Sequence, residues 1–252
     1  MSIHIDLNCD MGESFGAWTM GHDQEVMPWV SSVNIACGFH AGDPATMRRT
    51  VALALAHGVR IGAHPGLPDL GGFGRRAMAI SPQEAYDLVV VQVGALAAVA
   101  RSQGAALHHV KAHGALYNMA ARDAALAQAI ARAVADVDRG LVLYALAGSL
   151  QVQAGLEAGL AVAHEVFADR SYQPDGSLTP RQQPGAMITD VEQSVQQVLQ
   201  MVEHGQVTCL SGETITLQAD TLCLHGDQPG AADFARRLHQ AFRSRGIGVQ
   251  AV

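Results

Sequence analysis

A chain of 252 residues is long enough for one large domain or two small ones, and a single α/β barrel typically uses about 250 residues. Hydrophobic residues make up 49% of the sequence and charged residues 15%, which provides for a sizeable core and excludes a disordered chain. The 16 Lys and Arg residues against 23 Asp and Glu residues give a net charge of −7, which disfavours nucleic acid or an acidic membrane as a partner.

Along the chain, short apolar or alternating segments are followed by longer helical ones. The predicted strands cover residues 3–9, 32–37, 59–63, 106–112, 141–146, 160–167 and 221–224. The predicted helices cover residues 44–57, 82–103, 123–137, 149–158, 189–204 and 231–245. Ser81 stands as an N-cap before Pro82 at the first position of the second helix. Strands that alternate with helices predict parallel βαβ units, here in a single domain of residues 1–252.

Two segments depart from this alternation. Residues 170–185 are rich in proline and glycine and predict a long loop, a kind of segment that is often functional inside a compact domain. Residues 207–219 predict an accessory hairpin with its turn near Gly212. The glycine-rich loop at residues 71–76 offers a phosphate cradle as an alternative. The first strand is not followed by GxGxxG, so we predict a seven-stranded (β/α) barrel rather than a Rossmann sheet.

Cysteine usage and the N-terminal residues bear on the cellular compartment. The four cysteines show no CxxC spacing, which predicts free thiols in a reducing cytoplasm rather than a zinc knuckle or disulfides. The first residues lack the basic and apolar regions of a signal peptide, and polar groups interrupt every apolar run of membrane-spanning length. We therefore expect a cytoplasmic protein.

Polar side chains gather where the predicted strands end. In the first strand, Asp6, Asn8 and Asp10 share the face opposite Ile5 and Leu7. The later strand ends supply Asn34, His40, His64, Lys111, His113, Glu165, Asp169 and His225. One such residue alone is usually a helix cap or a satisfied structural group. Because α/β barrels place their chemistry at the carboxyl ends of the strands, the convergence of so many predicts an active site there.

Six ordered motifs give the chain a resemblance to a known family. The motifs are residues 6–13, 34–43, 62–66, 111–118, 167–172 and 225–227. Together they resemble the LamB/YcsF family, from about residue 3 to the end of the chain. The resemblance implies an irregular seven-stranded barrel related to the glycoside hydrolase/deacetylase superfamily. Those relatives bind a divalent metal ion with one Asp and two His, which makes Asp10, His40 and His64 the candidate ligands here.

The resemblance also implies a reaction. It is the ATP-driven opening of the lactam 5-oxo-L-proline to L-glutamate, with ADP and phosphate as the other products. It implies two partner subunits that resemble allophanate-hydrolase or carboxyltransferase proteins. The chain has no GxxxxGK[ST] motif, so we expect ATP to be bound partly or wholly with a partner.

The reaction requires a base for water, donors for the developing oxyanion and a cation near phosphate. The candidate catalytic residues are Asp10, Glu13, His40, His64, Lys111 and His113. The candidate substrate-binding residues are Asp6, Asn8, Asn34, Asn118, Glu165, Asp169, Arg170 and His225. Two other functions stay open: a metal-dependent amidohydrolase or carbohydrate deacetylase that acts alone, and a non-catalytic protein that binds a small carboxylate and presents it to a partner.

Overall fold

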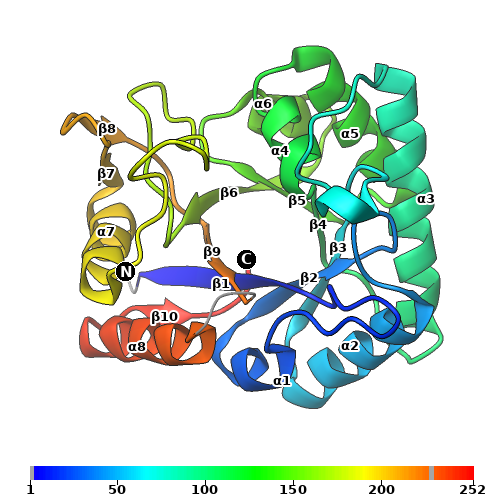
Figure 1. Ribbon diagram of the computed structural model, residues 1–252, viewed down its shortest axis with the longest axis horizontal. Helices are drawn as coiled ribbons and strands as arrows, with labels where there is room; N and C mark the ends of the chain where they lie inside the picture. Colours follow the sequence, from blue (N-terminus) through cyan, green and yellow to red (C-terminus); the bar gives the residue numbers. More distant parts are fainter. Residues whose placement is uncertain (1–2, 227–229) are drawn as a thin grey trace.

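The computed structural model describes residues 3–226 and 230–252 and contains a closed barrel of parallel strands (Figure 1). The seven barrel strands are β1 (His4–Met11), β2 (Ser32–Ala36), β3 (Arg60–His64), β4 (His109–Lys111), β5 (Val142–Leu146), β6 (Ala161–Phe167) and β9 (Thr221–His225). The barrel closes where β9 pairs with β1, which confirms the predicted seven-stranded (β/α) barrel. Asp227, the last residue of the sixth motif, lies outside the described residues.

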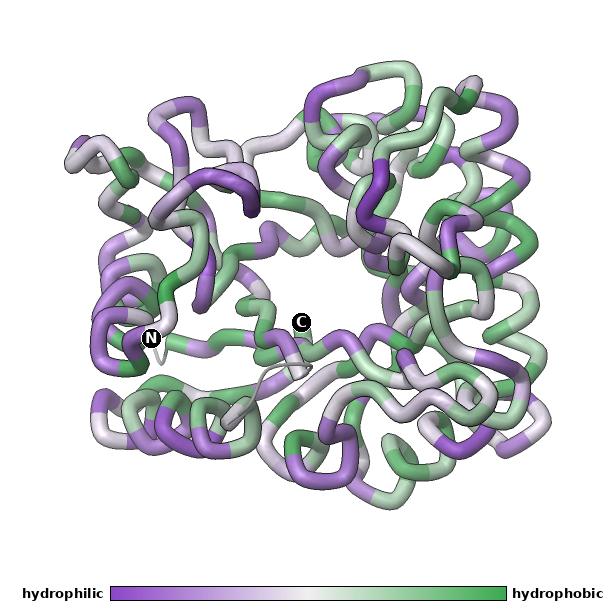
Figure 2. Tube along the Cα trace, in the orientation of Figure 1, coloured by the Kyte–Doolittle hydropathy of each residue, from purple (hydrophilic) through white to green (hydrophobic). Residues whose placement is uncertain are grey.

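Helices occupy the connections between the strands and surround the barrel (Figure 1). The six predicted ones are α2 (Pro44–His57), α3 (Pro82–Arg101), α5 (Ala124–Val137), α6 (Leu150–Glu157), α7 (Val191–His204) and α8 (Ala231–Ser244). Ser81 caps α3 as predicted, because its hydroxyl accepts a hydrogen bond from the Glu84 amide and the Glu84 carboxylate accepts one in return. Figure 2 shows hydrophilic and hydrophobic residues alternating along outer helices such as α8.

One helix, α3, is long and apolar enough to cross a membrane by length and composition alone, a test that core helices of soluble proteins also pass. Here α3 packs against α2, α5 and β3. Its apolar residues such as Val89 and Leu96 are buried in the common core. The helix therefore packs one face into the barrel wall, while residues such as Val91 on its outer face are exposed.

The structure adds short elements that the sequence pattern does not predict. They are α1 (Asp23–Val26), η1 (Met27–Trp29), η2 (Leu70–Gly72), α4 (Gly114–Ala120) and β10 (Gly248–Val249). The predicted strand 106–112 is too long, since β4 pairs with β3 and β5 only around His109–Lys111. The chain then turns into α4 directly after His113, which brings the next residues over the mouth of the barrel.

Both departures from the βα alternation appear where the sequence predicts them. The accessory hairpin consists of β7 (Gln206–Thr208) and β8 (Thr214–Thr216), which pair antiparallel in a sheet of their own. Residues 170–185 form a loop that contains only isolated bridges, such as Tyr172 with Leu178. This loop follows β6 at the carboxyl end of the barrel.

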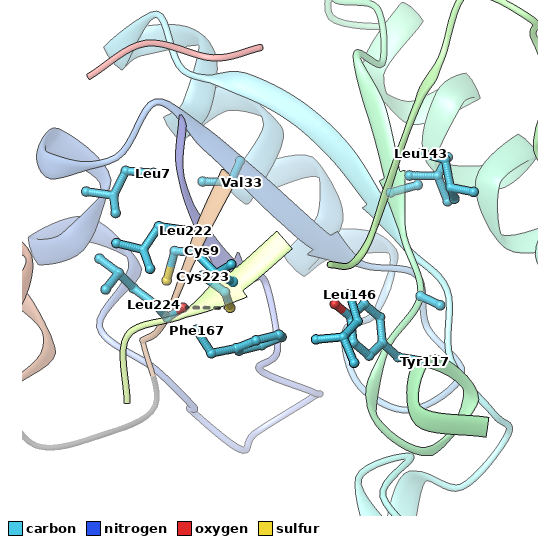
Figure 3. Close-up of a cluster of buried hydrophobic side chains, with 14 of the residues drawn as sticks. Leu7, Cys9, Val33, Tyr117, Leu143, Leu146, Phe167, Leu222, Cys223 and Leu224 are labelled. Atoms are coloured by element: carbon cyan, nitrogen blue, oxygen red, sulfur yellow. Dashed lines mark hydrogen bonds between the residues drawn. The ribbon is translucent and has the colours of Figure 1, made fainter. Parts of the chain in front are cut away.

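The barrel wall separates an apolar layer from a polar interior, as the strand alternation predicts. Leu7 and Leu222 are fully buried in the hydrophobic core outside the wall, and Figure 3 shows them gathered with Leu224. Asp6 and Asn8, on the other face of β1, bond to side chains from other strands inside the barrel. The β1 register places Asp10 between Asn34 of β2 and His225 of β9, so these three side chains are neighbours by construction.

A close approach between β3 and β4 generates a stability prediction. A Cβ atom at Gly62 would lie 2.1 Å from Nε2 of His109. His109 cannot move aside cheaply, because it bonds to Asn34 and stacks on Tyr144. We expect Gly62→Ala to lower the free energy of unfolding by about 3 kcal/mol, the upper part of the overpacking range, in urea denaturation.

The matched control is Gly94→Ala in the middle of α3, where an added Cβ has open space. Relief of the glycine entropy penalty should stabilise that variant by about 0.5–1 kcal/mol. Equal effects of the two substitutions would show that the β3–β4 contact is not tight.

Candidate active site

A pocket of about 760 Å³ opens at the carboxyl ends of the barrel strands. Seven of the predicted site residues line it: Asp10, His64, Lys111, His113, Asn118, Arg170 and His225. The pocket therefore lies where the polar strand ends predict it. The other predicted residues lie behind or beneath its walls, and their contacts assign them different surroundings.

The floor of the pocket is built on the buried ammonium group of Lys111 at the end of β4. Its Nζ lies 2.7 Å from Oε1 of Glu165 and 3.0 Å from Oδ1 of Asp10, and it donates a hydrogen bond to Oδ1 of Asn8 at 3.2 Å. Burial alone would lower the pKa of Lys111, but the charge of Asp10 and its other neighbours raises it well above the ordinary value. Burial alone would raise the pKa of Asp10, but His64 and Lys111 hold it well below the ordinary value. Both groups are therefore charged.

Below this floor lies a layer of hydrogen-bonded polar side chains. Asp6 accepts hydrogen bonds from the hydroxyls of Ser31, Ser32 and Thr221, at distances of 2.6–2.9 Å. Asn8 donates to Glu165 and to Thr221. Asn34 donates to Asn8 and Asp10, and its Oδ1 accepts from His109. Protein groups already occupy these side chains, so direct contact of Asp6, Asn8, Asn34 and Glu165 with a substrate stays a prediction.

Two histidines, His64 and His113, line one wall of the pocket, and a third, His40, is buried behind them; the three are called the histidine wall. Nδ1 of His64 lies 2.8 Å from the carbonyl oxygen of Lys111, and Nε2 of His113 lies 2.8 Å from that of Phe73. A carbonyl only accepts, so each of these nitrogens carries a proton. The remaining nitrogens, Nε2 of His64 and Nδ1 of His113, face each other at 3.0 Å. If both rings are neutral, two lone pairs oppose each other, so this position requires a proton or a metal cation between them.

The third histidine, His40, is fully buried, and neither of its ring nitrogens has a hydrogen-bond partner among the described residues. Its ring stacks on His113 with centroids 3.7 Å apart, and its Nε2 lies 4.0 Å from Oε1 of Glu13. Burial lowers the pKa of His40 well below its ordinary value and that of His113 to about 3. Ligand atoms of Glu13, His40, His64 and His113 all lie within 4.8 Å of one another.

This group differs from the predicted metal set, which contains Asp10 in place of Glu13 and His113. The Asp10 carboxylate is shared by Lys111, by Asn34 and, at 3.3 Å, by His64. The Asp10 carboxylate is already paired with the Lys111 ammonium group, which takes the place that a metal ion would have beside it. The geometry therefore gathers the candidate ligands around His40, with Asp10 beside them.

The opposite wall carries a second histidine–carboxylate pair. Nδ1 of His225 lies 2.8 Å from Oδ2 of Asp169, and Nε2 of His225 lies 3.2 Å from Nη2 of Arg181. Arg170 is buried, and its Nη2 donates to the carbonyl oxygen of Thr179. Its Nε has no hydrogen-bond partner among the described residues. Burial lowers the pKa of Arg170 to about 10, and Arg181 acts in the same direction.

Sequence reasoning missed several residues of the site. Tyr117 of α4 donates to Oε2 of Glu165 at 2.7 Å, and Arg75, Arg122 and Arg181 line the pocket. Tyr117 belongs to the motif at residues 111–118, so its place in a motif was the available signal. The arginines lie on loops and helix ends whose path a strand pattern does not predict. Asn118, a predicted residue, donates to the Gly114 carbonyl and faces the pocket.

The structure shows what surrounds the glycine-rich loop at residues 71–76 and the buried cysteine Cys37. A phosphate cradle needs free backbone amides, but the amides of residues 72–75 donate to carbonyl oxygens of residues 69–72. The loop carbonyls bond to the protein as well: that of Gly74 accepts from the Ala115 amide, and that of Phe73 accepts from His113. The loop therefore supports the histidine wall. Cys37 is buried, and burial raises its pKa to about 12, so it is a packing residue rather than a nucleophile.

Comparisons with known proteins agree on one family. The model of the LamB/YcsF family matches residues 5–252. The chain is 68% identical over its whole length to the A subunit of 5-oxoprolinase from Bordetella parapertussis, covering all of that protein. It is 61% identical to the A subunit of 5-oxoprolinase from Tolumonas auensis over 98% of this chain and 99% of that one. The crystal structure of the lactam utilization protein from Thermus thermophilus superposes with a TM-score of 0.94 at 49% identity, covering 99% of this chain and 100% of that one.

The buried neutral histidines generate a prediction about pH. Burial lowers the pKa of His109 well below its ordinary value. A histidine with a depressed folded-state pKa contributes stability at high pH and loses it as pH falls through the unfolded-state value, about 6.5. We expect stability to fall between about pH 7 and 5 in urea denaturation. His109→Gln should reduce this slope by up to about 1.4 kcal/mol per pH unit, because one fewer proton is taken up on unfolding.

The control for this measurement is His57→Gln, which changes an exposed histidine at the end of α2. Its slope should match that of the unmodified protein. A slope for His109→Gln equal to that of His57→Gln would contradict the neutral state of His109.

Proposed function

The chain belongs to the LamB/YcsF family, and from this membership we propose that it is the A subunit of an ATP-dependent 5-oxoprolinase, which opens the lactam of 5-oxo-L-proline to L-glutamate. The observation that carries the proposal is full-length similarity to proteins of that name, at 68% and 61% identity. Residues of five of the six motifs line the pocket described above, among them Asp10, His64 and Lys111.

The charge of the pocket fits an anionic ligand. Five arginines and one lysine line it: Arg75, Arg76, Arg122, Arg170, Arg181 and Lys111. Among the described residues, Asp10 is the one carboxylate in the lining, although the whole chain has a net charge of −7. Concentrated positive charge in a cleft attracts carboxylate and phosphate groups. The 5-oxoproline carboxylate and a phosphorylated lactam are both ligands of this kind.

The chemistry explains why such a ligand needs ATP. A lactam is a resonance-stabilised amide, and phosphorylation of its oxygen supplies a better leaving group and a more electrophilic carbon. The chain lacks a recognisable nucleotide motif, so we place ATP binding at least partly with two partner subunits of the allophanate-hydrolase or carboxyltransferase type, in the cytoplasm. The role proposed for this chain is to hold the lactam and admit water to it. Lys111 and the arginines stabilise developing negative charge.

A divalent metal ion fits the histidine wall. Buried His40 has two ring nitrogens without a hydrogen-bond partner among the described residues, and the lone pairs of His64 and His113 face each other. Metal ligands have this arrangement when their ion is absent. His64 and His113 each donate their other N–H to a backbone carbonyl, the support that metal-bound histidines commonly have. Glu13 completes the candidate set. When bound, the ion would polarise an oxygen of the substrate as a Lewis acid.

The functional assignment is tested with the complex. We expect glutamate release from 5-oxoproline only when this chain, both partner subunits and ATP are present. Asp10→Asn and His64→Ala should each lower kcat by about 100-fold or more, while the complex still assembles in gel filtration, because both residues line the pocket. The control is Asp87→Asn, an exposed carboxylate on α3. Glutamate release by the isolated chain would contradict the shared reaction, and full activity of both variants would place the chemistry elsewhere.

Metal binding is tested on the isolated chain, without reference to activity. In calorimetry with Zn²⁺ alone, we expect one ion per chain, together with a higher melting temperature, since a ligand that binds only the folded state stabilises it. His40→Ala should weaken binding by at least about tenfold, and His57→Ala should leave it unchanged. An unchanged melting temperature and no heat of binding with Zn²⁺ or Mn²⁺ would rule out the metal site.

A further inference from the structure

The pair of His225 and Asp169 has the arrangement of a proton-transfer dyad. His225 ends β9, and Asp169 lies two residues beyond the end of the adjacent strand β6. Their side chains are only 10% and 9% exposed, and the bond between Nδ1 and Oδ2 measures 2.8 Å. The ring of Phe167 stacks on the His225 imidazole at 6.1 Å between centroids, which helps to hold its orientation. The imidazole is therefore fixed on two sides, by a carboxylate and by an aromatic ring.

The hydrogen-bond partners specify which nitrogen carries the proton. Burial alone would raise the pKa of Asp169, but His225, Arg181 and Arg170 lower it overall, so Asp169 is an ionised acceptor. Nδ1 of His225 is then the donor in this bond. Nε2 of His225 lies 3.2 Å from Nη2 of Arg181, and a guanidinium group only donates. Nε2 therefore offers a lone pair, which is the state of a general base.

The lone pair lies at the pocket rather than in the core. His225 is among the residues that line the cavity, and its β9 register pairs it with Asp10 of β1. A ring nitrogen of His225, an oxygen of Asp10 and the sulfur of Cys223 lie within 4.8 Å of one another. Arg181 belongs to the loop of residues 170–185 and has an exposed side chain, so it can yield its place at Nε2 to water or substrate.

The same three ligand atoms could suggest a metal site instead. The ammonium group of Lys111 already lies 3.0 Å from Oδ1 of Asp10 and donates to Sγ of Cys223 at 3.1 Å. A second cation at this position would meet the charge of Lys111 at close range. In Figure 3, Cys223 lies next to Phe167, against the wall of the barrel. The geometry thus favours His225 as a proton acceptor over His225 as a ligand.

We propose that His225 is the general base that activates water for opening of the lactam ring, and that Asp169 is its positioning residue. This inference rests on the proposed function. In the lactam phosphorylated on oxygen, the ring carbon is joined to nitrogen by a double bond. Nε2 takes a proton from water as the water oxygen bonds to that carbon, the C=N π pair moves onto nitrogen, and nitrogen takes the proton back from Nε2. The new hydroxyl then gives its proton through Nε2 to nitrogen, as the C=O bond forms and the C–N bond breaks with its electron pair on nitrogen. The sum is addition of one water, which gives an amine and an acyl phosphate; a second water cleaves the acyl phosphate to glutamate and phosphate.

Kinetics of the assembled complex test the catalytic role. His225→Ala should lower kcat by about 100-fold or more with a smaller change in KM. Added imidazole should restore part of the activity of this variant, because the deleted ring lined an open pocket. Asp169→Asn should also lower kcat, and imidazole should not rescue it. His57→Ala is the control for an exposed histidine. Full activity of His225→Ala, or a loss that imidazole does not restore, would overturn the proposal.

A second measurement works on the isolated chain and does not depend on its substrate. Nitrogen-15 NMR of the His225 ring should show a protonated Nδ1 and an unprotonated Nε2 at neutral pH, and Asp169→Asn should shift the balance toward the other tautomer. A protonated Nε2 in the unmodified protein would refute the dyad. If the wild-type complex does not act on 5-oxoproline, the functional assignment fails, and this measurement still decides the state of His225.

Discussion

The ammonium group of Lys111, buried between Asp10 and Glu165, is the interaction on which the rest of the barrel interior depends. An unpaired charge in this position would be prohibitive, and breaking a buried ion pair typically costs about 3–5 kcal/mol. Two carboxylates around one ammonium leave an extra negative charge and unfilled hydrogen-bonding capacity. Asn8 and Tyr117 donate to Glu165, and Asn34 donates to Asp10. Neighbouring strands and α4 therefore supply polar groups at the same level along the barrel axis as the two carboxylates. The polar interior is thus a consequence of burying one cation.

Lys111 also links this layer to the histidine wall. Its side chain holds Asp10, and its backbone carbonyl accepts the Nδ1 proton of His64. His64 therefore presents Nε2 to Asp10 and His113. The backbone carbonyl of Phe73 likewise accepts the Nε2 proton of His113. Phe73 has a left-handed conformation, with φ of 55°. A non-glycine residue in this conformation carries backbone strain, which the hydrogen bonds of the surrounding loop must offset.

The sequence predicts the barrel and much of the site because both depend on a local rule. Alternation along β1 separates Asp6, Asn8 and Asp10 from Leu7, and parallel strands bring their carboxyl ends together. Strand alternation does not predict how deep in the barrel each of these polar residues lies. The structure places Asp6 deeper in the barrel than Asp10, among hydroxyl groups, and this layering depends on strand register and shear. This register is set by the pairing of β9 with β1, which joins strands far apart in the sequence.

The loops over the barrel mouth have no regular repeat, so the sequence predicts less of their structure. The approach of Arg181 to His225 connects residues 44 positions apart through an irregular loop. Glu13 and His113 join His40 through loops after three different strands, so no spacing in the chain marks them as one set. The concentration of positive charge is likewise a finding of the structure, since six cations line one pocket of a chain whose net charge is −7.

Barrel closure gives Asp10 its particular place in this arrangement. Its strand has Asn34 on one side and His225 on the other, so the carboxylate lies between the histidine wall and the His225–Asp169 pair. The two walls present different proton states: Nε2 of His225 offers a lone pair, whereas the space between His64 and His113 requires a positive charge. A base and an electrophilic centre in one pocket are the two components that water addition to an amide needs. Paired as it is with Lys111, Asp10 stays ionised between them and favours positive charge on either side.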